Sequence, residues 1–122
     1  MSTPDERMRC LIWGGQLLWD IQEGEGLLLE HRDRARDLHL AYPSEDDLRL
    51  LVRSQAKAMH TDHASSIGAA GRLFNAVQQS AYGSAELRSL VLFTLRHFPA
   101  ERLAESWAKG FFPGIEDWLA EP

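Results

Sequence analysis

The chain has only one cysteine, Cys10, so no disulfide bond can form within it. Such a sequence is typical of a reducing compartment, and we expect a cytoplasmic protein with Cys10 as a small core residue. No apolar run approaches the roughly 18 residues that a membrane-spanning helix needs. Residues 1–6 lack the basic and apolar regions of a signal peptide, so the sequence predicts neither membrane insertion nor export by that route.

The chain also has fewer basic residues than acidic ones. The 122 residues include 13 lysines and arginines against 18 aspartates and glutamates, which gives a net charge of −5 at pH 7. A general nucleic-acid binder or a membrane-surface binder would need a net basic face, so this balance disfavours both classes. A basic or neutral-to-cationic partner fits the acidic balance better.

The sequence lacks a diagnostic catalytic or cofactor motif. No serine or cysteine can be combined with histidine and aspartate into a defined catalytic arrangement. The glycine-rich stretch 24–26 is short and acidic, and the stretch 68–71 precedes no lysine, so neither resembles a phosphate-binding loop. We therefore expect neither enzymatic activity nor a cofactor.

Helical periodicity and helix-start signals are what the sequence does contain. Thr3, Pro4 and Glu6 form a capping box with proline at the first helical position, and Ser44 precedes three acids. With 44% hydrophobic residues, the chain can bury one core. The sequence predicts a single all-α domain over residues 1–122, a bundle of six to seven helices near 4–22, 27–41, 44–58, 62–81, 84–97 and 100–109, with a short seventh after Pro113.

An internal repeat is the most informative feature of the chain. When the sequence is shifted by 56 residues without a gap, seven of the 31 positions from Gly15 to Glu45 are identical, where about two would match by chance. Tyr42 pairs with Phe98, and Pro43 pairs with Pro99. We therefore expect two tandem three-helix repeats with pseudo-symmetry, near residues 4–58 and 61–110, followed by a C-terminal helical segment at 111–122.

The two copies differ in ways that bear on packing. Residues 89–95 are apolar nearly all round, which predicts that the second helix of the second copy is central and buried. In the first helix, Met8, Leu11, Ile12, Gly15, Leu18 and Trp19 are expected to form the buried face. Small residues at 14–15 and 68–71 would let another helix approach closely, within one chain or between two, so a homodimer is possible.

The segment 111–122 has no counterpart in the first copy. Pro113 at a first helical position, followed by Glu116 and Asp117, predicts a short terminal helix. Trp118 either seals an edge of the core with its aromatic neighbours or anchors a partner, because aromatic residues dominate binding hot spots.

Two further clusters have chemical interpretations that compete with simpler ones. His60 and His63 lie three apart and could share a metal, with Asp62 adding an oxygen ligand, although Asp62 is better explained as a helix cap. Arg49, Arg53 and Lys57 follow one face of a helix after a tight turn and could read DNA. Glu45 precedes Arg49 by four residues, which also fits an ordinary surface ion pair.

The acidic residues are expected at two opposite ends of the bundle. Most of them are explained as helix caps and solvated helix ends, but clustered carboxylates can also receive a basic protein and speed its association. One end would hold Asp5, Glu6, Glu45, Asp46 and Asp47, and the other Asp20, Glu23 and Glu25.

Three short stretches carry a resemblance to a known family. Residues 4–9 read Pro-Asp-Glu-Arg-Met-Arg, residues 38–43 read Leu-His-Leu-Ala-Tyr-Pro, and residues 95–99 read Leu-Arg-His-Phe-Pro. They resemble short, uncharacterised Gram-negative bacterial proteins that open with Pro-x-Glu-Arg-x-Arg and later carry Leu-Leu-Arg-His-Tyr-Pro. The resemblance implies a bacterial origin and transfers no activity or site residue.

Size, acidity, helicity and the missing catalytic motifs together favour a non-catalytic protein-protein interaction module. Its most concrete form is a small acidic bacterial inhibitor, an immunity protein or antitoxin that occupies the active cleft of a toxin or effector. A helix-turn-helix DNA-binding regulator is the alternative hypothesis, and a helical bundle that binds a metal or small ligand is the second alternative.

Overall fold

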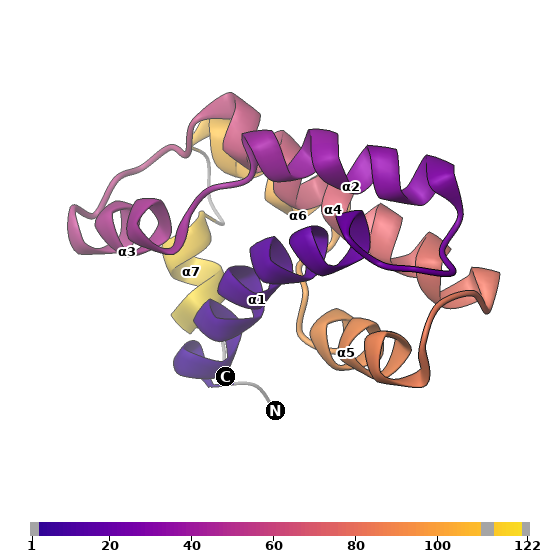
Figure 1. Cartoon of the computed structure of the whole chain (residues 1–122). Coiled ribbons are helices and arrows are strands. Elements are labelled where there is room, and N and C mark those ends of the chain that lie inside the picture. The colour runs from indigo at the N-terminus through magenta and orange to yellow at the C-terminus, as the bar shows by residue number, and fades with distance from the viewer. Residues whose placement is uncertain (1–2, 111–113, 121–122) are drawn as a thin grey trace.

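The computed structural model describes residues 3–110 and 114–120, and helices account for about three quarters of this part of the chain (Figure 1). It has no β-strand there, so the all-α prediction is confirmed for the described residues. The prediction for Pro113 lies outside them. The elements are α1 (Pro4–Gln22), α2 (Leu29–Ala41), α3 (Glu45–Arg53), α4 (Thr61–Ser80), α5 (Ala85–Leu95), α6 (Glu101–Ser106), a 3-10 turn η1 (Trp107–Lys109) and α7 (Ile115–Ala120).

Helix starts follow the capping signals of the sequence. The Thr3 side chain accepts a hydrogen bond from the Glu6 amide, and Ser44 and Asp47 form a reciprocal capping box. The 56-residue shift relates the starts of the later helices: α2 begins at Leu29 and α5 at Ala85, while α3 begins at Glu45 and α6 at Glu101. These correspondences support the repeat.

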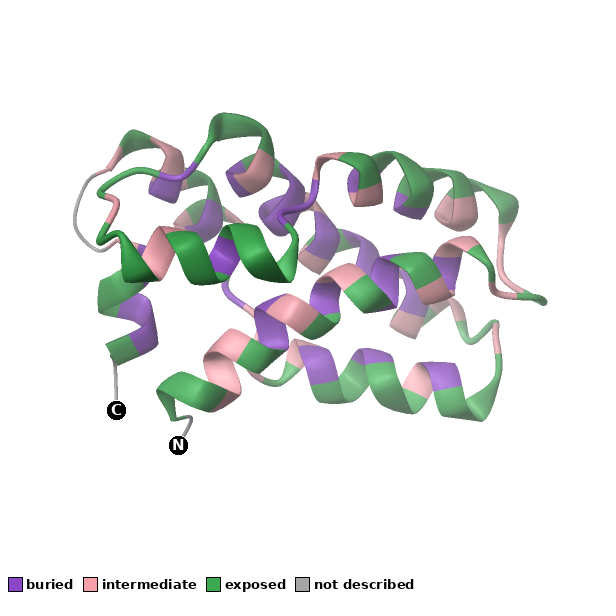
Figure 2. Ribbon diagram, turned by 60° about the vertical axis from the view of Figure 1, so that its left-hand side comes forward, coloured by how far each residue is buried: buried purple, intermediate pink, exposed green. Residues whose placement is uncertain are grey.

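Two long helices, α1 and α4, run through the middle of the bundle, and the shorter helices pack around them. α2 lies against both α1 and α4, and α5 also lies against both of them. Each copy therefore packs its second helix on its own first helix and on the first helix of the other copy. Figure 2 shows that the buried residues concentrate on the sides of the helices that face one another.

One pair of hydrogen bonds locks the two copies together and obeys the same shift. The Cys10 thiol on α1 donates to the carbonyl oxygen of Thr94 on α5, at 3.2 Å. The Ser66 hydroxyl on α4 donates to the carbonyl oxygen of Leu38 on α2, at 2.7 Å. Position 66 is position 10 plus 56, and position 94 is position 38 plus 56. The first helix of each copy is therefore bonded to the second helix of the other.

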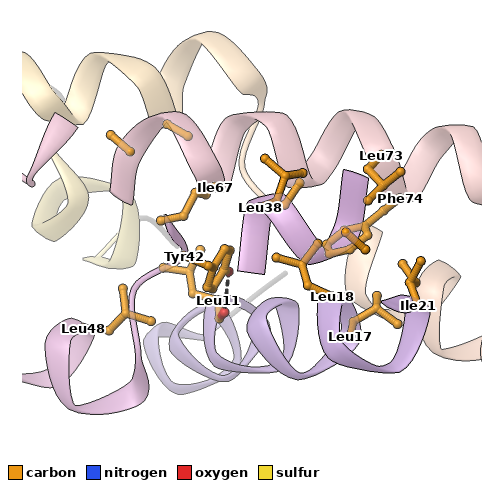
Figure 3. Packing of buried hydrophobic residues seen from close by; sticks show 14 of the residues in the cluster. Leu11, Leu17, Leu18, Ile21, Leu38, Tyr42, Leu48, Ile67, Leu73 and Phe74 are labelled. Atoms are coloured by element: carbon orange, nitrogen blue, oxygen red, sulfur yellow. Dashed lines mark hydrogen bonds between the residues drawn. The ribbon is translucent and has the colours of Figure 1, made fainter. Parts of the chain in front are cut away.

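Glycines in α1 and α4 make room for two aromatic rings at the centre of the bundle. A Cβ atom added at Gly15 would lie 3.1 Å from the Tyr42 ring, and one added at Gly71 would lie 3.2 Å from the Phe98 ring. Gly14 faces both rings, because its added Cβ would lie 2.5 Å from the Tyr42 hydroxyl and 2.8 Å from Phe98. Figure 3 shows the Tyr42 hydroxyl donating to the Leu11 carbonyl, at 2.5 Å.

The third helices of the two copies pack differently. α6 lies along α4, where an added Cβ at Gly68 would come within 3.1 Å of the Glu101 carbonyl oxygen. The matching position in α1 is Ile12, whose branched side chain leaves no such room. No comparable packing joins α3 to α1, and α3 lies at one end of the molecule (Figure 1).

The predicted extension of this third helix to residue 58 is wrong. α3 ends at Arg53, and Gln55 adopts a left-handed backbone with φ of 55°, which a continuing helix cannot accommodate. Lys57 consequently lies outside the helix, so Arg49, Arg53 and Lys57 do not form a helical stripe.

The prediction that α5 is the central, buried helix is also wrong. α5 packs through one face only, which consists of Leu87, Val91 and Thr94. Its outer residues Leu90, Leu92 and Phe93 are 51%, 51% and 49% exposed. The sequence is apolar on both faces of this helix. In the described part of the chain, however, no further helix covers the outer face.

Trp19, which was expected on the buried face of the first helix, is 45% exposed. Its ring lies 5.6 Å from that of His39 on α2. Leu11 and Leu18 from the same predicted stripe are fully buried, so the stripe was right at its centre and too wide at its edge.

No helix in the described residues is both long enough and apolar enough to cross a membrane.

Gly14→Ala tests the central contact. Alanine favours helix formation by about 1 kcal/mol, but the added methyl group would collide with the side chains of Tyr42 and Phe98, and overpacking costs about 1–3 kcal/mol. Because the added Cβ would lie within 2.8 Å of both aromatic side chains, we expect a cost in the upper part of that range, about 2–3 kcal/mol, and hence a net loss of about 1–2 kcal/mol in the free energy of unfolding, measured by urea titration. Gln16→Ala, at an exposed position of the same helix, is the control and should leave stability nearly unchanged. A Gly14→Ala variant as stable as the wild type would contradict the close contact.

Candidate docking groove between α1 and α5

A groove runs between α1 and α5 on either side of one aromatic pair. Its larger hollow, of about 290 Å³, is lined by residues of both helices. A smaller hollow of about 70 Å³ lies on the other side of the pair. We call the two hollows together the α1–α5 groove; its lining comprises Glu6, Arg9, Cys10, Trp13, Gln16, Leu17, Asp20, Leu90, Phe93, Thr94 and His97.

The aromatic pair consists of Trp13 on α1 and Phe93 on α5. Their ring centroids are 5.6 Å apart and the ring planes are inclined by 41°. Both rings are nearly half exposed, at 42% and 49%, and Leu90 beside them is 51% exposed. A single exposed apolar side chain is ordinary, whereas three that line one hollow make it a candidate binding surface.

The groove exists because α1 has large or charged residues where α4 has alanine. Under the 56-residue shift, Trp13 corresponds to Ala69 and Asp20 corresponds to Ala76. α2 packs more extensively against α4 than α5 does against α1. Small side chains let the first pair of helices close together, whereas Trp13 and Asp20 hold the second pair apart.

Asp20 gives one end of the groove a negative charge. Its carboxylate accepts a hydrogen bond from Gln16, at 3.2 Å, and has no cation beside it among the described residues. Glu23 and Glu25 follow it on the surface at the end of α1. At the other end, the Glu6 carboxylate lies 3.8 Å from the His97 imidazole, so that charge already has a partner.

Cys10 lines the smaller hollow but has no nucleophilic character. Its side chain is only 2% exposed. Burial raises the pKa of the thiol to about 12. A protonated thiol that donates to the Thr94 carbonyl is a structural group, as the sequence predicted for Cys10.

Of the predicted acids of the third helix, Asp47 is the one that caps it. The Glu45 carboxylate pairs with Arg49, at 2.9 Å, and Asp46 is exposed. Asp47 accepts a hydrogen bond from the Ser44 amide, and this bond lowers the pKa of its carboxyl group. α3 lies at the opposite end of the molecule from the α1–α2 connection (Figure 1), so these acids and Asp20 do not form one surface.

The two histidines of the possible metal site lie side by side, with ring centroids 5.4 Å apart. His60 caps α4, because its Nδ1 accepts from the Asp62 amide, so the cap is His60 rather than the predicted Asp62. The His63 imidazole lies 3.9 Å from the Asp47 carboxylate. Within residues 3–110 and 114–120, no set of three or more ligand-type side chains gathers to hold a metal.

The DNA-reading stripe is not assembled. Arg49 is engaged by Glu45, Arg53 is at the end of α3, and Lys57 lies beyond the helix. The two cations that remain on α3 follow a helix start made of three acids, which would face the phosphates.

Trp118 is only 7% exposed and lies against Trp107, with ring centroids 5.4 Å apart. Arg7 covers its other side, 5.4 Å from the ring centroid, and donates to the Trp118 carbonyl oxygen. Two roles were predicted for Trp118, and its burial fits the first of them, which is to seal an edge of the core. It does not offer the ring to a partner.

The sequence prediction did not single out Trp13, Leu90 or Phe93. Trp13 lies outside the apolar stripe of its helix, and this was the one available signal for an exposed aromatic residue. Phe93 and Leu90 were assigned to a buried helix. Only the spacing between α1 and α5 reveals that these side chains meet in a groove.

Comparisons with known proteins add no assignment to this geometry. No protein-family model, curated protein or solved structure matches the chain. The chemistry of the groove residues themselves is therefore the basis for a functional proposal.

The state of Cys10 can be tested with a thiol reagent. Because the thiol is buried and its pKa is about 12, we expect the native protein to react with DTNB at pH 8 at least about 100-fold more slowly than the urea-unfolded chain. The measurement is the rate of thionitrobenzoate release. Complete reaction of the native protein within mixing time would contradict the buried, protonated thiol.

Proposed function

We propose that this chain is a non-catalytic protein-protein interaction module and that the α1–α5 groove is its docking surface. The observation that carries the proposal is the half-exposed Trp13–Phe93 pair beside a hollow of about 290 Å³. An apolar side chain of the partner would enter the hollow, and the two aromatic rings would cover it. Tryptophan and other large aromatics contribute disproportionately to binding energy at such positions.

The charge beside the groove indicates the chemistry of the partner. Asp20 lies in the lining without a cation, and the whole chain carries a net charge of −5. A partner that presents a lysine or arginine next to an apolar side chain would match both features. Long-range attraction would also speed the encounter of the two proteins, most strongly at low salt.

An acidic bacterial inhibitor of the immunity-protein or antitoxin kind is the form of this function that we favour. Such a protein needs to occupy a basic active cleft and needs no catalytic residues of its own. DNA binding is less well supported, because Lys57 lies off α3 and Arg49 is paired with Glu45. A metal-dependent role is less well supported because, among the described residues, His63 approaches His60 and Asp47 but no set of three ligand-type side chains gathers.

Trp13→Ala and Asp20→Asn test the docking surface. Tagged wild-type and variant proteins would be used to isolate partners from the source bacterium, and the affinity for the captured protein would then be measured by calorimetry. We expect Trp13→Ala to weaken binding by at least about tenfold, because it removes the larger half of the aromatic pair. Asp20→Asn should lower the association rate, with a difference that shrinks as salt increases.

Leu40→Ala is the matched control for these variants. Leu40 is a large apolar residue on α2 with 82% exposure, and it does not line the groove. Its removal should leave binding unchanged. Equal binding by wild type and Trp13→Ala, with both variants folded by circular dichroism, would contradict docking in the groove.

A further inference from the structure

The exposed residues on the outer face of α5 are arranged so that they could pair with the same residues of a second, antiparallel α5. Exposed residues on this face are Glu86, Ser89, Leu90, Leu92, Phe93 and Arg96. They are arranged around the level of Val91, which points into the core. These six residues form three pairs, which lie one, two and five residues on either side of Val91.

Two antiparallel helices related by a twofold axis bring such counterparts opposite each other. With the axis at the level of Val91, Ser89 faces Phe93 of the second copy, because each is two residues from the axis. A small side chain then lies opposite a large one. Leu90 and Leu92 lie toward opposite edges of the face, so apolar side chains flank the two central Ser89–Phe93 pairs on both sides.

The charges at the two ends of this face complete the match. Glu86 and Arg96 each lie five residues from Val91, on opposite sides of it. Both are exposed, and neither has an ion-pair partner within the described residues. In the antiparallel arrangement, Glu86 of each copy faces Arg96 of the other, which forms two ion pairs across the axis.

We propose that α5 is a homodimerisation helix whose partner is α5 of a second copy, packed antiparallel about a twofold axis at Val91. A heterologous partner would need no such match between the two halves of the face, whereas an isologous contact requires it. The dimer goes beyond the proposed docking function and does not depend on it. The dimer face and the groove share Leu90 and Phe93, whereas Trp13 and Asp20 line the groove only and Leu92, Glu86 and Arg96 lie on the dimer face only.

The contact covers one helix of 11 residues, which is small for an interface. We therefore expect a weak dimer, with a Kd on the order of tens of micromolar. Sedimentation velocity over a concentration series from about 5 to 500 µM would show this as a mass that rises from monomer to dimer.

Charge reversal tests the arrangement. Glu86→Arg or Arg96→Glu alone should weaken dimerisation by at least about tenfold, because each places like charges opposite one another. The double variant Glu86→Arg/Arg96→Glu restores opposite charges across the axis and should recover the wild-type Kd. An equal mixture of the two single variants should form a heterodimer through two attractive pairs, because one variant is positive at both positions and the other is negative at both.

Arg34→Glu reverses an exposed arginine on α2 and is the control for net charge; it should leave the Kd unchanged. A wild-type chain that stays monomeric at the highest concentration would overturn the proposal. Single reversals without effect, or a double variant that does not recover, would overturn the antiparallel geometry. Arg96→Glu should retain capture of a partner and Trp13→Ala should retain dimerisation, so failure of one proposal is distinguishable from failure of the other.

Discussion

The structure depends on the contact of Tyr42 and Phe98 with the glycines of the two central helices. Gly14 faces both rings, and a methyl group there would approach them to 2.5 and 2.8 Å. The contact between the glycine backbone and the rings holds the C-terminal ends of α2 and α5 against α1 and α4. It therefore fixes the two turns at Pro43 and Pro99, which follow these rings in the sequence. Glycine weakens each helix locally, but the close approach of two aromatic residues replaces that loss with buried apolar surface.

Single small residues also decide how the two copies differ. Gly68 lets α6 lie along α4, whereas Ile12 at the matching position keeps α3 away from α1. Trp13 opens a groove at the position where Ala69 permits close packing. The two copies therefore share one helix arrangement, in which the helices around α4 pack closely and those around α1 leave a groove. The candidate docking surface is that groove.

Local signals in the sequence predicted the helices well, because capping and termination depend on neighbouring residues. Ser44 and Thr3 cap the helices where expected, and the starts of the second and third helices of the two copies follow the 56-residue shift. The burial of α5 could not be predicted, since an apolar helix is covered only if another element is free to cover it. The groove was missed for the same reason: it is a distance between helices, and Trp13 alone carries no information about α5.

The crossed hydrogen bonds from Cys10 to Thr94 and from Ser66 to Leu38 make each copy incomplete without the other. A chain of half this length could satisfy the same contacts only by pairing with an identical chain. In its packing, the fold is thus equivalent to a symmetric dimer whose two subunits are joined end to end. Once the halves are covalently linked, symmetry is no longer required, and each half can acquire its own surface.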